Sequence, residues 1–306
     1  MTQASARSVS AGIGYMLLAA LGFSVMGGAA KSLKGEFNAG QLVLWRNLVG
    51  FAVLLPGLLL QPPRQQGGHF FRLLFRGMMG TTALYTLLYC ILHLPLGTAM
   101  SYNLTSALFI ALFSFVLFRE YEGRRVLLAL FIGFAGMLLI YRPTMDVPWF
   151  YHLAGLLSGI TSAIAYLTVG RLTAYYDTRV IVLSFVATGI VTPLLLMAAR
   201  VLFQLPADDL FFIEWKLPAA RDWFAVLLLG LAALFGQYFV TKAYGAARAG
   251  IVSVIGYSNI LFSVFIGMLL GDAFPGWVSW AGIACIIGSG ILISSLQKKE
   301  EATTTS

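Results

Sequence analysis

An arginine lies well inside a long apolar stretch of this 306-residue chain. If residues 39–60 form a helix, Arg46 lies about seven residues from its N-terminal end, a depth on the order of 10 Å. A cation in apolar surroundings usually faces a cavity or a partner, and a guanidinium fork matches a carboxylate or phosphate. The structural alternative is that Arg46 reaches the polar edge of the helix or caps carbonyls of a neighbouring helix. Both interpretations stay open.

Tyrosines and small polar residues occur deep inside several other apolar stretches. A buried Tyr hydroxyl needs a hydrogen-bond partner, and Tyr rings beside amides and hydroxyls would form a mixed pocket for an amphipathic metabolite. Besides Arg46, the candidate substrate-binding residues are Tyr85, Tyr102, Ser106, Tyr166, Gln237, Tyr238, Tyr257 and Asn259. The alternative is that these groups hold helices together.

Two stretches share one plan, with a leading Gly, a polar first third, an apolar second half and a terminal acid. They are Gly97–Glu120 and Gly250–Asp272. We expect Glu120 and Asp272 to be structural, bonded to helix ends or to bases such as Arg124; gating is the alternative. No Asp or Glu falls in the middle of a predicted span, so a proton relay would lack a carboxylate. This favours facilitated diffusion or exchange.

Enzyme and metal motifs are missing from the sequence. It contains no G-x-S-x-G, H-E-x-x-H or C-x-x-C, and Cys90 and Cys285 lie in apolar runs as expected of buried free thiols. We therefore predict no catalysis, no metal and no cofactor. The net charge of +8 comes from single basic residues between apolar runs, which does not fit a nucleic-acid-binding face.

Composition indicates a membrane protein that crosses the bilayer many times. The chain is 59% hydrophobic and only 10% charged, whereas soluble proteins are roughly a quarter charged. We predict ten transmembrane helices at 11–33, 39–60, 71–92, 95–118, 124–141, 151–173, 178–202, 222–244, 247–270 and 276–296. Lys and Arg gather mainly at the helix ends on one side, where we count Arg72 and Arg76. The positive-inside rule then puts both termini in the cytoplasm.

An internal repeat divides the chain into two halves. At an offset of 153 residues, Gly77 matches Gly230 and Gly97 matches Gly250. Each half contains five predicted helices, an odd number, so the second half would be inverted, which is a common transporter design. We predict a short N-terminal segment, a first repeat, a second repeat and a solvated, disordered tail. Their ranges are 1–10, 11–143, 144–296 and 297–306. The segment 203–221 is predicted to be an interfacial loop; a substrate lid is the alternative.

The sequence resembles the drug/metabolite transporter superfamily, in its EamA-like branch. The resemblance is carried by Lys31, by Arg46 in LVLWRNLVG, by LPLGTAMSYNLTSALFIALFSFVLFRE, by GFAGMLLIYRP and by TKAYGAARAGIVSVIGYSNILFSVFIGMLLGD. It covers nearly the whole chain. Asp272 departs from the pattern, since the family more often has Glu there. The resemblance implies a pseudo-twofold, all-helical bundle around a central cavity that works by alternating access.

Together these features predict a secondary transporter of the inner membrane that moves a small organic metabolite, with export favoured. The best match is an amino acid or related anionic or zwitterionic compound. A carrier for a nucleotide-derived or other aromatic metabolite is the alternative, and an intramembrane enzyme is a remote third. The expected partners are the substrate and the lipid bilayer. Small residues on 124–141 and 276–296 would also suit a homodimer.

Overall fold

The protein is a bundle of α-helices. The computed structural model describes residues 3–63, 65–94, 96–118, 123–141, 148–206, 211, 213–270 and 276–304. The helices of the first half are α1 (Gln3–Ser32), α2 (Ala39–Leu60), α3 (Phe70–His93), α4 (Leu96–Leu104), α5 (Ser106–Phe118) and α6 (Arg124–Tyr141). Those of the second half are α7 (Trp149–Leu172), α8 (Thr178–Phe203), α9 (Trp223–Ala246), α10 (Ala249–Gly256), α11 (Ser258–Leu269) and α12 (Trp277–Thr304).

Apolar side chains cover much of the outside of the bundle. Large exposed side chains such as Phe71, Leu195 and Trp277 would be costly in water but are suited to lipid. Six helices are long and apolar enough to cross a membrane, and shorter apolar helices cover Tyr102–Val116 and Trp280–Ser289. The chain is therefore a multi-pass membrane protein, as its composition predicts.

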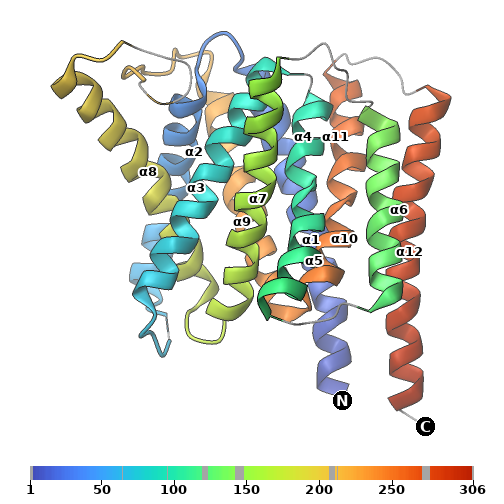
Figure 1. Ribbon diagram of the computed structural model, residues 1–306. Helices are drawn as coiled ribbons and strands as arrows, with labels where there is room; N and C mark the ends of the chain where they lie inside the picture. The colour runs from blue at the N-terminus through green and yellow to red at the C-terminus, as the bar shows by residue number, and fades with distance from the viewer. Residues whose placement is uncertain are drawn as a thin grey trace.

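Helices from the two halves pack against each other in matching pairs. Helix α1 packs along α9, and α7 packs along α3. Helix α2 packs against α8, and α6 against α12, the latter pair standing side by side in Figure 1. The beginning of α1 and the end of α12 lie at the same end of the bundle (Figure 1). The cavity described below lies between helices of both halves.

Two of the predicted helices are interrupted rather than continuous. The predicted helix 95–118 breaks at Thr105, between α4 and α5, and the predicted helix 247–270 breaks at Tyr257, between α10 and α11. At the first break the Thr105 hydroxyl and backbone N–H both donate to the Tyr102 carbonyl, at 2.6 and 3.1 Å. At the second, the Tyr257 N–H donates to the Val254 carbonyl at 3.2 Å. These tight i→i−3 bonds replace a regular helical turn.

The C-terminal tail is also different from the prediction. Helix α12 continues to Thr304, so residues 297–304 extend the helix instead of forming a disordered tail. The charged run after Gln297 contains Lys, Glu and Ala, which are strong helix formers. A helix that is already started can therefore propagate through them.

The small residues of α6 and α12 pack against each other within the chain. A Cβ on Gly136 would lie 2.6 Å from the Gly282 carbonyl oxygen and 2.8 Å from Cys285 Cβ, so the two helices approach closely there. Ala129 and Ser289 are completely buried. Packing within the chain accounts for this pattern without a second copy.

Candidate functional site

A cavity lies inside the bundle and is lined by helices from both halves. Its volume is about 90 Å³, which leaves room for several water molecules. Met16, Met26, Leu84, Leu87 and Ala165 form apolar parts of the wall. The polar part contains Arg46, Arg76, Asn103, Ser106, Ser162, Tyr166, Gln237, Tyr244, Ser253 and Asn259. This mixture of an apolar wall with a few polar groups is typical of a small-molecule site.

Arg46 reaches this cavity from α2 and is only 3% exposed. Its Nη1 donates to the side-chain oxygen of Asn47 at 3.1 Å, and Asn47 in turn donates to the Val43 carbonyl at 2.7 Å. The guanidinium lies over the ring of Phe185 in α8, 5.1 Å from its centroid, where a cation–π contact is favourable. The structure thus places Arg46 inward, facing a cavity, rather than at the polar edge.

Arg76 is the functional candidate that the sequence interpretation missed. We counted it among the cytoplasmic helix ends, but α3 begins at Phe70, so Arg76 lies well inside that helix and is 1% exposed. Its guanidinium lies 4.8 Å from the centroid of the same Phe185 ring. The sequence pattern that singled out Arg46, a charge several residues inside an apolar helix, could also have identified Arg76.

The two arginines place two positive charges close together in an apolar interior. Because both guanidinium carbons lie near one ring centroid, at 5.1 and 4.8 Å, they are within about 10 Å of each other, the sum of the two distances. With an effective dielectric constant of about 20, Coulomb's law gives a repulsion of at least about 1.7 kcal/mol at that separation. Among the described residues no carboxylate lines the cavity to compensate for this repulsion.

The fully buried polar atoms of the cavity wall that lack a partner among the described residues are N–H donors. Arg46 Nε, Arg76 Nε, Arg76 Nη1 and Gln237 Nε2 are buried and have no hydrogen-bond partner among the described residues. A buried donor without a partner is unfavourable. A molecule that supplies hydrogen-bond acceptors would satisfy these donors.

Tyr166 and Tyr244 form an aromatic part of the wall. Their rings are stacked, with centroids 4.8 Å apart and planes 12° apart, between α7 and α9. Ser106, the first residue of α5, lines the cavity just after the break at Thr105. The break therefore helps to set where this hydroxyl points.

Asn259 lines the cavity, but its amide is already used in helix packing. Its Nδ2 donates to the Ala20 carbonyl and to the Ser24 hydroxyl, both at 2.9 Å. The Ser263 hydroxyl lies 3.5 Å from its oxygen. These bonds fasten α11 to α1, so in this arrangement Asn259 joins helices, which was the alternative interpretation.

Of the nine predicted binding residues, five line the cavity and four tyrosines do not. Tyr85 is 3% exposed and its ring lies 6.3 Å from that of Phe211. The Tyr102 hydroxyl bonds to His152 Nδ1, while Tyr238 lies beneath the Lys242 ammonium at 4.7 Å. Tyr102 and Tyr238 thus have a polar and a cationic partner away from the cavity, whereas the buried Tyr85 hydroxyl has no partner among the described residues. They lie outside the lining of this cavity, and their substrate-binding role stays a prediction.

Tyr257 is completely buried, but against α6 and α12 instead of the cavity. A Cβ on Gly133 would lie 2.5 Å from its ring and 3.0 Å from Ser289 Oγ, so the ring occupies the space that these small residues leave. Its position at the α10–α11 break directs the side chain towards α6 and α12.

Glu120 and Asp272 lie outside the described residues.

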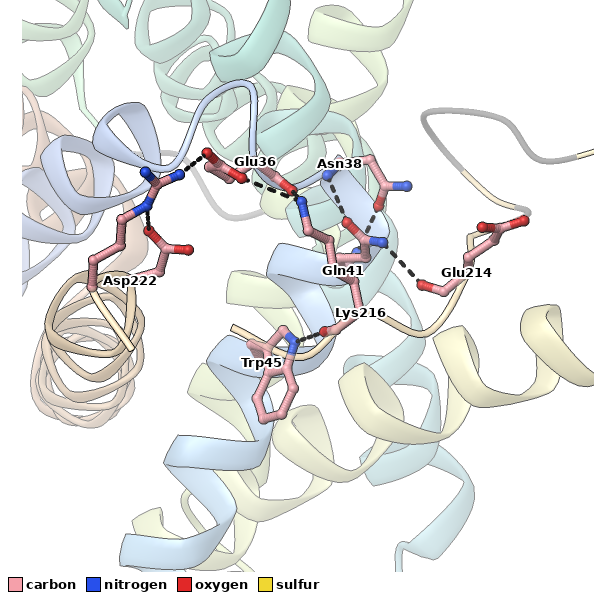
Figure 2. Close-up of polar contacts among 8 residues, drawn as sticks. Glu36, Asn38, Gln41, Trp45, Glu214, Lys216 and Asp222 are labelled. Atoms are coloured by element: carbon pink, nitrogen blue, oxygen red, sulfur yellow. Dashed lines mark hydrogen bonds and ion pairs between the residues drawn. The ribbon is translucent and has the colours of Figure 1, made fainter. Parts of the chain in front are cut away.

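The segment before α9 is fastened to the beginning of α2. Gln41 Nε2 donates to the Glu214 carbonyl at 2.9 Å, and Trp45 Nε1 donates to the Lys216 carbonyl at 3.0 Å (Figure 2). The Trp45 ring also contacts the ring of Trp215, with centroids 5.5 Å apart. We call residues 213–222 the strap.

Charged groups hold the strap to the loop between α1 and α2. Glu36 pairs with Arg221 and, at 3.4 Å, with Lys216, and Arg221 lies 3.5 Å from Asp222 (Figure 2). Exposed Trp215 and Leu217 fit the predicted interfacial loop. Trp45 is next to Arg46 in the chain, so its contacts with Trp215 and Lys216 also tie the strap to α2, the helix that carries Arg46.

Known proteins resemble this chain over nearly its full length. The chain is 32% identical to an uncharacterized transporter of Helicobacter pylori, over 92% of this chain and 94% of the relative. It is 31% identical to the pseudopaline exporter CntI of Pseudomonas aeruginosa, over 95% of this chain and 98% of the relative. A crystal structure with 18% identity matches the fold with a TM-score of 0.71, covering 92% of this chain and 97% of that one.

The EamA-like transporter family model matches twice, at residues 10–142 and 149–295. The two matches together cover most of the chain. The chain belongs to the EamA-like transporter family, a family of transporters and not of enzymes.

Proposed function

We propose that this protein is a secondary transporter that moves a small organic anion or zwitterion across the inner membrane, with amino-acid-like compounds as the first candidate class. The observation that carries the proposal is the buried guanidinium of Arg46, which faces the cavity with an unpaired Nε–H. A carboxylate would accept from such a group with the geometry that arginine favours. Gln237 adds a neutral donor to the same wall.

Alternating access is supported by the relation between the two halves. The family model matches each half separately, at 10–142 and 149–295. Each half also has one helix that is interrupted near its middle, α4–α5 and α10–α11. We propose that the repeats are inverted, that ten helices span the membrane, and that both termini are cytoplasmic. Rocking of one repeat against the other would open the cavity to either side in turn.

Export is the favoured direction, and proton coupling is not expected. A relative with 31% identity is named as an exporter. No Asp or Glu lies in the middle of any of the ten predicted spans, so a proton relay would lack a carboxylate. Facilitated diffusion or exchange of substrates is therefore the proposed mode. Glu120 and Asp272 remain proposed structural residues at the ends of the two interrupted helices.

A carrier for a nucleotide-derived or other aromatic metabolite is the second candidate. The stacked rings of Tyr166 and Tyr244 on the cavity wall favour it, since aromatic rings also stack on bases. A homodimer through α6 and α12 is a separate proposal. It would use their outer faces, where Leu128, Phe131 and Trp280 are exposed.

The proposed function is tested with the purified full-length chain in proteoliposomes. Vesicles are loaded with an excess of one unlabelled L-amino acid or nucleoside, and uptake of the labelled compound is followed. We expect saturable counterflow for an acidic or zwitterionic amino acid. Counterflow of nucleosides alone would favour the second candidate, and concentration of substrate by a pH gradient alone would contradict uncoupled transport.

A further inference from the structure

We propose that the substrate carries two negative charges, which Arg46 and Arg76 bind together; this inference rests on the proposed transport function and narrows its substrate class. Arg46 comes from α2 and Arg76 from α3, two consecutive helices that enter the bundle from opposite ends (Figure 1). Both guanidinium groups meet at the ring of Phe185. The pair is therefore assembled inside the bundle and does not belong to one polar helix end.

The charge balance of the site leaves two positive charges without a counterion. Among the described residues, every ion pair lies outside the cavity wall. A substrate with a single negative charge would neutralise one guanidinium and leave the other uncompensated in an apolar wall. A dianion neutralises both, so its binding removes the repulsion between them.

The hydrogen-bonding capacity agrees with the charge balance. Arg76 keeps two unpaired N–H positions, Nε and Nη1, and Arg46 keeps Nε. Arg46 Nη1 is occupied by Asn47. Both arginines therefore have N–H donors left for an acidic group, two nitrogens on Arg76 and one on Arg46.

A purely structural role does not explain the pair. An arginine that stabilises a helix bundle is expected to bind carbonyls or a carboxylate. Arg76 is 1% exposed, yet two of its three guanidinium nitrogens lack a partner among the described residues. Buried N–H donors without hydrogen-bond partners are costly for stability, and stability is often given up at groups kept for binding.

The test measures binding to the purified full-length chain in detergent by isothermal titration calorimetry. The probes are malonate, succinate, glutarate and adipate, each compared with its own monoamide, which keeps the length but loses one charge. Methyl phosphate is added to distinguish one dianionic group from two carboxylates. The variants are Arg76→Gln, Arg76→Lys and, as a matched control, Arg72→Gln, which removes an exposed charge one turn away on the same helix.

We expect the best dianion to bind wild-type protein at least tenfold more tightly than its monoamide. Arg76→Gln should reduce this preference below threefold, Arg76→Lys should keep part of it, and Arg72→Gln should keep all of it. Without ligand, the Tm of Arg76→Gln should equal or exceed that of wild type, because an unpaired buried charge is removed. If Arg76→Gln does not fold, the proposal is tested by the dianion preference of Arg76→Lys and by the wild-type comparison of each dianion with its monoamide.

Two results separate the failure of this inference from the failure of the proposed function. If singly charged acids or zwitterions bind and are transported but dianions bind no better than their monoamides, the two-charge inference is wrong and the proposed function stands. If no organic anion or zwitterion binds or is transported, both are wrong. A dianion preference that survives Arg76→Gln unchanged also overturns the assignment to Arg76.

Discussion

Tyr166 and Tyr244 stack face to face across the contact between α7 and α9, with ring centroids 4.8 Å apart and planes 12° apart. Both residues line the cavity. The ring of Tyr166, more than its hydroxyl, should then shape the wall. We predict that Tyr166→Phe changes the half-saturating substrate concentration less than threefold, while Tyr166→Ala raises it about tenfold, which corresponds to about 1.4 kcal/mol.

Counterflow in proteoliposomes checks this prediction. Equal effects of the two substitutions would show that the hydroxyl matters and the stack does not. The melting temperatures of both variants should be recorded beside the transport data, because removal of a packed ring from a core is destabilising in its own right.

Gln237 and Asn259 both line the cavity but should respond differently to mutation. Gln237 Nε2 has no partner among the described residues, whereas Asn259 Nδ2 has two, Ala20 and Ser24. Gln237→Leu should therefore weaken substrate binding several-fold and leave stability nearly unchanged. Asn259→Leu should lower stability by about 1 kcal/mol, the usual size of an interhelical hydrogen bond in membranes, and leave affinity nearly unchanged.

Denaturant unfolding and substrate titration of the two variants provide the comparison. The account would be in error if Asn259→Leu weakened binding as strongly as Gln237→Leu while unfolding like wild type. In that case Asn259 would be a substrate ligand, as the sequence interpretation had it.

Two glycines lie at a close approach between α1 and α9. A Cβ on Gly22 would lie 2.9 Å from the Gly236 backbone nitrogen, and a Cβ on Gly236 would lie 2.8 Å from the Phe23 ring. Gly22→Ala should lower stability by about 1–3 kcal/mol, because the helices would have to separate. Gly14→Ala, on the same helix with nothing within 4 Å, is the matched control.

The control should be neutral or slightly stabilising, since Ala favours the helix over Gly. Thermal unfolding in detergent would measure both variants. Equal melting temperatures for Gly22→Ala and Gly14→Ala would contradict the close packing of α1 on α9.

The strap is expected to be released when Trp45 loses its N–H. Trp45→Phe keeps an aromatic ring near Trp215 but cannot donate to the Lys216 carbonyl. Hydrogen exchange in residues 213–217 should become faster by about five- to tenfold, as expected for the loss of about 1 kcal/mol. Exchange in the middle of α9 should stay unchanged, and unchanged exchange in the strap would show that this bond does not hold it.

The helical membrane fold could be predicted from the sequence because lipid leaves few alternatives to a helix. Arg46 could be predicted too, since a charge inside an apolar stretch needs no knowledge of its neighbours. Arg76 carried the same signal, but its place near a helix end made it resemble a topology signal. Only the packing of α3 against α8 shows that it turns inward to Phe185.

The helix breaks and the tyrosines show where sequence patterns are insufficient. Thr105 is an ordinary residue inside an apolar helix, and its bond to the Tyr102 carbonyl becomes visible only in three dimensions. Depth within a helix does not define which face a Tyr occupies. Tyr257 had the right depth but fills the space beside Gly133.

The most direct test of the account is substrate counterflow by proteoliposomes that contain wild-type protein, Arg46→Lys or Arg46→Gln, at matched protein amounts and with melting temperatures recorded. The account predicts that Arg46→Gln raises the half-saturating concentration of the transported acid or zwitterion at least tenfold, and that Arg46→Lys lies between it and wild type. It would be contradicted if both variants fold and transport the substrate with the affinity of wild type.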